Sequence, residues 1–339
     1  MPLIKRVCCL FLFATHTGFA FAYGSAGHEA IGALTDQYIA GTNAEKEVKA
    51  LLKKVKAGIT LQQAAVWADC AKGVYKAAAD GSFRYRVNPI FSECRPFETA
   101  KGKALMIDFV RRNWDNCDAF KPSEPCHKQY HYTDIAIQRD AYKKKLAGTS
   151  DTDLVSAAEA AIAVLQGRPA PAPFSIKDKS EALLILAHYI GDLHQPMHVA
   201  SVYLDTQGQL VDPDKGTLDH ATETRGGNSL KIGTKNLHSL WDSIPKTLDA
   251  SHMGQTRLKA LRQVEKSDGP IESWPAIWAS DTLHAGKAAF SGIEYQPKMK
   301  VNWPITLPDG YTKQRTDIQR EELIRAGARF GQILEAIWP

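Results

Sequence analysis

Two histidine–aspartate pairs with the same spacing are the residues of this chain best suited to bind a metal ion. His188 and Asp192 are four positions apart, and His238 and Asp242 repeat that spacing fifty residues later. Residues i and i+4 share one face of an α-helix, so each pair can direct an imidazole and a carboxylate toward one point. His198 lies between the two pairs. Zinc favours this mixture of nitrogen and carboxylate ligands, and the pattern therefore predicts a zinc site.

The helix that carries the first pair is expected to be deeply buried. Residues 182–187 form an unbroken apolar run inside a helix expected at 178–194, and a helix that is apolar on all sides belongs in a core. A carboxylate at Asp192 then needs a strong partner, because an unpaired buried charge is very costly. Metal ligation supplies one, and a His–Asp hydrogen bond inside the core is the alternative. His194 lies off the face that His188 and Asp192 share and is interpreted either as a residue that supports the metal ligands or as a structural one.

Helical periodicity continues through most of the chain. Further helices are expected after an N-cap at Ser25, after a capping box formed by Thr60 and Gln63, at 151–166 and at about 316–337. Two segments, 73–130 and 201–235, are rich in turn-forming residues and are predicted to be long ordered loops. No repeat or linker is visible. The prediction is therefore a mainly α fold, a single-domain helical bundle.

The first residues are expected to be a signal peptide. Lys5 and Arg6 precede an apolar stretch at 7–14, and an Ala-Phe-Ala cleavage site follows at 20–22. Cleavage after residue 22 leaves 23–339 and implies a secreted or periplasmic protein, whereas a buried N-terminal helix is the alternative. No later stretch is apolar for long enough to cross a bilayer, so no membrane anchor is expected.

The remaining cysteines are even in number, which favours disulfide bonds in an exported chain. Cys117 and Cys126 bracket a proline-containing loop and are expected to pair, which leaves Cys70 and Cys94 for a second bond. Free buried thiols are the alternative.

The charge balance permits an anionic substrate without requiring one. The formal net charge of the full sequence is +5, which is only mildly basic. No cluster of Lys and Arg residues indicates binding to duplex DNA.

The order of these motifs resembles that of a known family. The string from His188 through Asp192 to His198, then Gly226-Gly227-Asn228, then the run from Asn236 to Asp242, is similar to the zinc-dependent single-strand nucleases. Mung bean nuclease and its fungal relatives typify that family. Its members are mostly helical and share a fold with bacterial zinc phospholipase C, so the resemblance implies the same fold here.

The resemblance implies three zinc ions per chain. The first would take Asp69, His131, His188 and Asp192, the second His198, His238 and Asp242, and the third Tyr23, His28 and a bridging Asp192. The family's first mature residue is a tryptophan whose amine and carbonyl bind the metal, and Tyr23 takes its place. An α-amine gives up its proton to zinc more easily than a lysine does, because its pKa is near ~8.

The resemblance also implies a reaction and a substrate. Single-stranded DNA and RNA would be cut by in-line displacement to 5′-phosphorylated products, with 3′-nucleotidase activity as a further expectation. Asp69 would orient the attacking water, and Lys72 would stabilise charge at phosphorus, although a solvated surface lysine is the alternative. Tyr132, Asp134 and Asn228 would bind a nucleoside. The expected protein is a monomer.

One departure from the family lies between Asp69 and His131, which are separated by 62 positions, far more than in the fungal proteins. The added residues, about 73–130, include three cysteines and are expected to form a disulfide-braced lid over the cleft. Two other readings stay open: a zinc-dependent phospholipase C, and a secreted zinc-binding protein without turnover.

Overall fold

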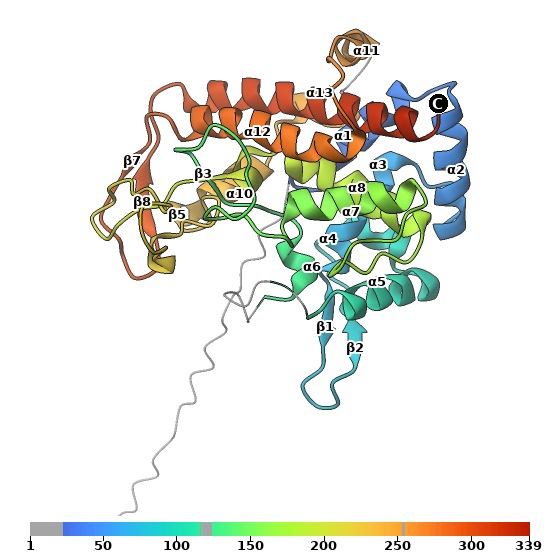
Figure 1. Ribbon diagram of the computed structural model, residues 1–339, viewed down its shortest axis with the longest axis horizontal. Helices are drawn as coiled ribbons and strands as arrows, with labels where there is room; N and C mark the ends of the chain where they lie inside the picture. Colours follow the sequence, from blue (N-terminus) through green and yellow to red (C-terminus); the bar gives the residue numbers. More distant parts are fainter. Residues whose placement is uncertain (1–22, 116, 118–123, 253–254) are drawn as a thin grey trace, which may run out of the picture.

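The chain folds mainly into helices around one core (Figure 1). The structure is a computed structural model that describes residues 23–115, 117, 124–252 and 255–339, and the expected signal peptide at 1–22 lies outside the described residues. Within those residues there are thirteen α-helices and eight short strands, so the mainly α prediction is confirmed. None of the helices described is long and apolar enough to pass through a membrane.

The bounds of the elements are as follows. The helices are α1 Ser25–Tyr38, α2 Asn43–Val55, α3 Leu61–Ala64, α4 Trp67–Ala71, α5 Ala100–Arg112, α6 Cys126–Gln129, α7 Leu154–Leu165, α8 Lys179–Leu193, α9 Pro196–Val199, α10 Leu237–Asp242, α11 Gln255–Arg262, α12 Trp274–Phe290 and α13 Tyr311–Ile337. The strands are β1 Val74–Lys76, β2 Phe83–Tyr85, β3 Ile135–Ala136, β4 Ala200–Ser201, β5 Leu230–Ile232, β6 Lys235–Asn236, β7 Glu294–Tyr295 and β8 Trp303–Thr306.

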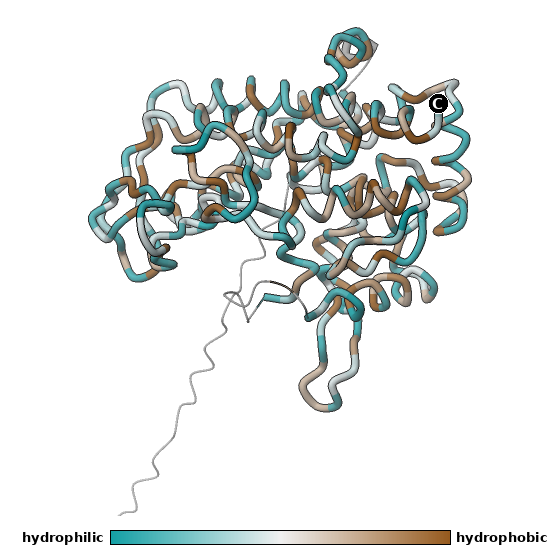
Figure 2. Tube along the Cα trace, in the orientation of Figure 1, coloured by the Kyte–Doolittle hydropathy of each residue, from teal (hydrophilic) through white to brown (hydrophobic). Residues whose placement is uncertain are grey.

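Helix α8 is the central element, as its apolar sequence predicts. The Asp178 side chain caps it by accepting hydrogen bonds from the backbone N–H groups of Ser180 and Glu181, and every residue from Ser180 to Leu193 is buried. Helices α1, α2, α4, α7 and α13 pack around it. Figure 2 shows the apolar residues gathered on these inner helices and the hydrophilic residues on the outer turns. The helix is therefore held rigidly on all sides.

Helices α1, α3 and α13 each differ in one respect from the sequence prediction. Gly24, not Ser25, is the N-cap of α1, and no side chain caps that helix. Thr60 does cap a helix, accepting a hydrogen bond from the N–H of Gln63, but that helix stops at Ala64 and restarts as α4 at Trp67. The break leaves a backbone carbonyl, that of Ala65, free to accept a hydrogen bond from α8. Helix α13 also begins earlier than expected, at 311 rather than 316.

The segment 73–130 is not a long loop. It contains the antiparallel β1–β2 hairpin, which protrudes from the body in Figure 1, a 3₁₀ helix at Ser92–Phe97, and helices α5 and α6. Thr99 caps α5 by accepting a hydrogen bond from the N–H of Gly102. The glycines, prolines and aromatics that surround α5 obscured its amphipathic pattern in the sequence.

Two disulfides brace this segment, and both predicted pairings are confirmed. Cys70 at the end of α4 is bonded to Cys94, and Cys117 is bonded to Cys126. The first bond fixes the 3₁₀ helix against α4. The hairpin is thereby held beside the core at both of its ends.

Short strand pairings bring distant segments together. Strand β3 pairs in parallel with β4, with Ile135 opposite Ala200, which places the chain before β3 beside the chain before β4. The predicted loop at 201–235 is largely irregular, although it contains β5. Strands β5 and β6 join β7 and β8 in a four-stranded sheet ordered β6-β5-β8-β7.

Candidate metal centre

The first group of side chains converges where α8 meets α4 and the segment before β3. The Nδ1 atom of His131 lies 2.9 Å from Oδ2 of Asp192 and 3.1 Å from Nε2 of His188. The same His188 nitrogen is 3.3 Å from Asp192 and 3.5 Å from Oδ1 of Asp69. Of these four residues, His131, His188 and Asp192 are fully buried, and Asp69 is nearly so. The four residues assigned to the first zinc are therefore neighbours.

A backbone contact fixes the tautomer of His188. Its Nδ1 atom is 2.7 Å from the carbonyl oxygen of Ala65, the group freed by the break between α3 and α4. A carbonyl only accepts, so Nδ1 carries the proton and Nε2 presents its lone pair to His131, Asp192 and Asp69.

His28 reaches the same place from α1. Its ring stacks on that of His188 at 3.7 Å between centroids, and its Nε2 atom is 3.4 Å from Oδ1 of Asp192. Among the described residues neither nitrogen of His28 has a hydrogen-bond partner, and neither does Oδ1 of Asp192. Gly191 permits this approach, because a Cβ atom there would lie 2.6 Å from Nδ1 of His28.

The second group consists of the residues assigned to the second zinc. Nε2 of His198 lies 3.0 Å from Nε2 of His238, and these atoms are 3.7 and 3.8 Å from Oδ1 of Asp242. The Nδ1 atom of His198 is 2.6 Å from the carbonyl oxygen of His131, and the Nδ1 atom of His238 is 2.8 Å from the carbonyl oxygen of Gly226. Both Nδ1 atoms therefore carry protons, so in the neutral imidazoles the lone pairs of the two Nε2 atoms face each other across 3.0 Å.

Neighbouring residues hold the second group in place. The Nε2 group of Gln195 donates to Oδ1 of Asp242 over 2.8 Å. Gly226 adopts a φ of 54°, and a Cβ atom there would lie 2.0 Å from the Met197 carbonyl oxygen, so a glycine is required to present its carbonyl to His238.

Asp192 joins the two groups. Its Oδ1 atom is 3.8 Å from Nδ1 of His198, so this one carboxylate lies within 4 Å of four imidazoles, those of His28, His131, His188 and His198. Asp192 is the residue predicted to bridge the first and third zinc ions, and it lies beside His131 and His188 of the first set and His28 of the third.

Burial dominates the electrostatics of the centre. Burial raises the pKa of Asp192 and raises that of Asp242 to about 7, while burial lowers the pKa of His28, His188 and His238 to about 4. The imidazoles are therefore neutral, with lone pairs available to a cation, and two carboxylates are held in an environment that disfavours their charge. Bound cations would compensate both effects.

Asp69 behaves differently because Lys72 lies beside it. Burial alone would raise the pKa of Asp69, but Lys72, with His188 and His28, lowers it to about 2. Nζ of Lys72 is 2.6 Å from Oδ1 of Asp69, and the side chains are only 9% and 10% exposed. Lys72 is thus not a solvated surface lysine, and it holds a fixed positive charge at the edge of the cluster.

Among the residues that the structure describes, three sets of side chains have the composition and spacing to hold a metal ion. They are His131, His188 and Asp192, then His198, His238 and Asp242, then His28, Asp69 and His188, each with ligand atoms within 4.8 Å of one another. The third set includes His28 as predicted but groups it with Asp69 and His188. The facing lone pairs and unpartnered buried atoms fit metal ions better than they fit hydrogen bonding.

Tyr23 lies at the border of the second group. Its ring is fully buried, its hydroxyl donates to the carbonyl of His194 over 3.2 Å, and the next N–H, of Gly24, donates to the carbonyl of Asp242 over 2.7 Å. His194 itself bonds the Ile190 carbonyl and faces Arg329 at 3.1 Å, which agrees with a structural role.

The three residues assigned to nucleoside binding each form hydrogen bonds with different neighbours. The Tyr132 hydroxyl donates to Oε2 of Glu124 over 2.7 Å, and the ring is partly exposed. Asp134 is buried beside Tyr203, whose hydroxyl donates to the Asp134 carbonyl over 2.8 Å. Asn228 donates from its side chain to the Arg225 carbonyl. Of the three, only Tyr132 directly adjoins in sequence a member of these His–Asp groups, His131.

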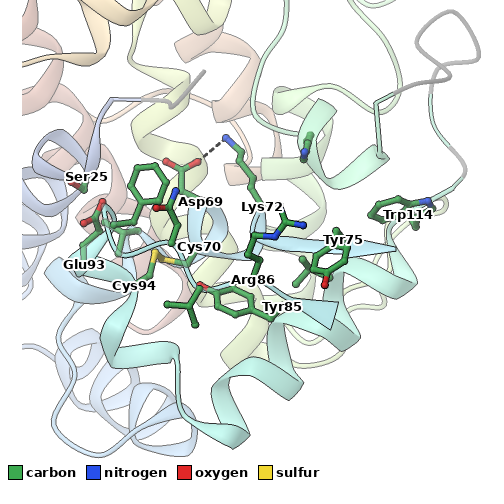
Figure 3. A pocket seen from close by; sticks show the side chains of 17 residues that line it. Ser25, Asp69, Cys70, Lys72, Tyr75, Tyr85, Arg86, Glu93, Cys94 and Trp114 are labelled. Carbon is green, nitrogen blue, oxygen red and sulfur yellow. Dashed lines mark ion pairs between the residues drawn. A yellow bond between two sulfur atoms is a disulfide. The ribbon is translucent and has the colours of Figure 1, made fainter. Parts of the chain in front are cut away.

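A cavity of about 490 Å³ borders the cluster at Asp69 and Lys72 (Figure 3). Most of its wall comes from the segment 73–130, and the sequence prediction missed these residues. Its aromatic and cationic lining includes Tyr75, Tyr85, Arg86, Phe91, Trp114 and Lys128. The sequence does contain one indication of this wall, the dipeptide Asp80-Gly81 between two short β-prone runs. Asp-Gly favours a hairpin turn, and a hairpin would bring the aromatic and cationic residues of the two runs together.

Known proteins share the pattern of this chain. A family model described as S1/P1 Nuclease matches residues 23–339. Endonuclease 2 of Arabidopsis thaliana is 27% identical over 180 residues, which cover 47% of this chain and 52% of the relative. Endonuclease 5 of the same plant is 27% identical over 175 residues, which cover 47% and 51%. The chain spans about half the length of these curated relatives. Because the family model covers nearly the whole sequence, the chain belongs to the S1/P1 nuclease family.

Proposed function

We propose that this protein is a zinc-dependent endonuclease that hydrolyses phosphodiester bonds of single-stranded DNA and RNA to 5′-phosphorylated products. The observation that carries the proposal is the 3.0 Å distance between the Nε2 atoms of His198 and His238, whose lone pairs face each other beside Asp242. Two neutral imidazoles repel in that arrangement unless a cation lies between them. Membership of a nuclease family supplies the substrate class.

Nine residues are proposed to hold three zinc ions. They are Tyr23, His28, Asp69, His131, His188, Asp192, His198, His238 and Asp242. When bound, zinc would supply Lewis-acid chemistry, depressing the pKa of water toward ~7 and stabilising charge on phosphate oxygens.

Asp69 and Lys72 are proposed to act on the reacting groups. Because its pKa is lowered to about 2, Asp69 is ionised near neutral pH and can accept a hydrogen bond that orients the attacking water. The Lys72 ammonium, held 2.6 Å from that carboxylate, can donate to a phosphate oxygen as its charge develops. The displacement is in line: the water oxygen forms a bond to phosphorus as the bond between phosphorus and the 3′-oxygen of the sugar breaks, and the proton that the water loses passes through solvent to the departing 3′-oxygen.

Nucleoside binding by Tyr132, Asp134 and Asn228 is proposed for the base next to the cleaved bond. Stacking on Tyr132 is tolerant of base identity and requires an unstacked base, which favours single strands. Because a single unpaired base is enough for this stacking, a 3′-mononucleotide could also bind and lose its 3′-phosphate.

The N-terminal amine of Tyr23 is proposed as a ligand after removal of residues 1–22 and export to the periplasm or medium. The two disulfides support an oxidising compartment. The buried Tyr23 ring and the Gly24–Asp242 hydrogen bond support a fixed chain start beside α10. One added residue before Tyr23 should reduce the zinc content and activity but not the folding; unchanged zinc content and activity would refute this part.

A substrate panel tests the proposed activity. Single-stranded DNA, duplex DNA, RNA and a 3′-mononucleotide are each incubated with the mature protein, with and without a chelator, alongside phosphatidylcholine. We expect single strands to be cut fastest and every activity to be lost with the metal. Preferential hydrolysis of phosphatidylcholine would indicate a phospholipase C instead, and no turnover of any substrate would indicate a metal-binding protein.

A further inference from the structure

The cavity beside Asp69 and Lys72 has two kinds of wall. One side is formed by the metal-site elements, including Ser25, Asp69 and Lys72, and the other by the added segment 73–130 (Figure 3). Its volume of about 490 Å³ lies within the range of about 300–1,000 Å³ typical of small-ligand sites. A ligand in the cavity would therefore be next to the proposed reaction centre.

The added segment supplies flat aromatic surfaces to this cavity. Tyr75 of β1, Phe91 after the hairpin and Trp114 after α5 all line it, and Tyr75 is partly exposed. Disulfide Cys70–Cys94 also lines it and holds the hairpin side against α4. These surfaces are thus presented by a braced element rather than by a freely moving loop.

Arg86 is positioned over one of the aromatic rings. Its guanidinium carbon lies 4.9 Å from the Tyr75 ring centroid, and the residue is exposed. Within the part of the chain that the structure describes, Arg86 forms no ion pair, whereas the nearby Arg84 pairs with Asp80 at 2.7 Å and does not line the cavity. Arg86 is therefore available to an anion from solution.

Positive charge is concentrated on the side nearest the cluster. Lys72 and Lys128 both line the cavity. Together with Arg86 they outnumber the two acidic residues of the wall, Asp69 and Glu93.

We propose that this cavity is a nucleotide subsite contributed by the added segment: Tyr75 stacks on a base of single-stranded nucleic acid, and Arg86 binds a backbone phosphate adjoining the one that is cleaved. The inference rests on the proposed nuclease function and deepens it. Cations on an aromatic, partly apolar wall match the alternation of phosphate and base along a single strand. A lipid chain would use the apolar wall but leave Arg86 and its stacked ring without a role.

The test compares Tyr75→Ala and Arg86→Ala with the matched control Arg84→Ala in the full metal-loaded protein. KM and kcat are measured for a single-stranded decanucleotide and for methyl p-nitrophenyl phosphate, which has no base. We expect KM for the oligonucleotide to rise about tenfold in the first two variants, which is about 1.4 kcal/mol, with little change in kcat. Kinetics with the small ester, and both activities of Arg84→Ala, should stay unchanged.

A binding measurement separates this inference from the proposed activity. Fluorescence anisotropy of a labelled phosphorothioate decanucleotide, which resists cleavage, with the metal-loaded protein should show about tenfold weaker binding in Tyr75→Ala and Arg86→Ala than in Arg84→Ala. If the wild type cuts no nucleic acid, the proposed function fails, whatever the binding result. Equal affinities for all three variants, or equal loss on both kinetic substrates, would overturn the subsite. Hydrolysis of short-chain phosphatidylcholine that falls in Tyr75→Ala would overturn the nucleotide as its occupant.

Discussion

Gly191 on α8 leaves the space that the His28 imidazole occupies, and filling that space is a selective way to disturb the proposed metal centre. In Gly191→Ala the added Cβ would lie 2.6 Å from Nδ1 and 2.8 Å from Cε1 of His28. Favourable contacts between heavy atoms begin near ~3.5 Å, so the ring must move by about 1 Å. That movement changes the 3.4 Å separation between Nε2 of His28 and Oδ1 of Asp192.

The stability cost of this change should be small. Overpacking a buried site costs about 1–3 kcal/mol, but alanine is about 1 kcal/mol better than glycine inside a helix. The net loss in the free energy of unfolding is therefore about 0–2 kcal/mol. The functional cost should be larger, because a displacement of about 1 Å in a catalytic arrangement can reduce the rate about 100-fold.

Gly327→Ala on α13 is the matched control. Its Cβ would lie 2.6 Å from Cβ of Leu34, an equally close contact that involves no residue of the metal centre. Both proteins are assayed for zinc per chain by elemental analysis, for single-strand cleavage and for urea unfolding. We expect Gly191→Ala to lose about one zinc and most activity, and Gly327→Ala to lose only stability.

Full zinc content and normal cleavage in Gly191→Ala would refute the assignment of His28 to the metal centre. Equal zinc loss in Gly327→Ala would show that any strain at α1 produces the effect, and would refute the local argument.

Three further changes test other parts of the structure. Replacing Gln195 by Met removes the hydrogen bond to Asp242, so one zinc ion should bind about 10–100-fold more weakly in a calorimetric titration. Unchanged zinc affinity would show that Gln195 does not support Asp242 as a ligand. Replacing Cys70 and Cys94 by serine opens a loop with a sequence separation of 24 and should lower the free energy of unfolding by about 3 kcal/mol in urea, whereas no loss would contradict the bracing role. Burial raises the pKa of Asp153 from 3.8 to about 6, so protonation favours the folded state. The stability of metal-free wild type relative to Asp153→Asn should therefore be highest below pH 4 and fall by about 3 kcal/mol as the pH rises past 6, and a flat difference would exclude this effect.

The helical parts of the metal centre could be predicted because their spacing is local. The i, i+4 repeat places His188 with Asp192 on one helix face, and the apolar run around them marks a buried helix. Asp69 and His131 are different, since 62 positions separate them and only the resemblance to a family placed them together. Their proximity depends on the packing of α4 against α8 and on the β3–β4 pairing.

The supporting contacts could not be predicted from residue types. The carbonyl of Ala65 orients His188 only because the chain breaks between α3 and α4, and nothing in the identity of an alanine signals that role. The segment 73–130 was misinterpreted as a loop because its turn-forming residues dominate its composition. Helix α5 forms nonetheless, since Thr99 caps it and Met106, Phe109 and Val110 provide a buried face.

Three buried zinc ions are proposed to enable this chain to cut single-stranded nucleic acid. The most direct measurement is made on one sample of mature protein, in which zinc per chain and the rate of single-stranded DNA cleavage are followed through chelation and stepwise return of zinc. We predict about three zinc ions per chain, complete loss of cleavage on their removal, and recovery as zinc returns. Cleavage that persists in fully metal-free protein would contradict the account.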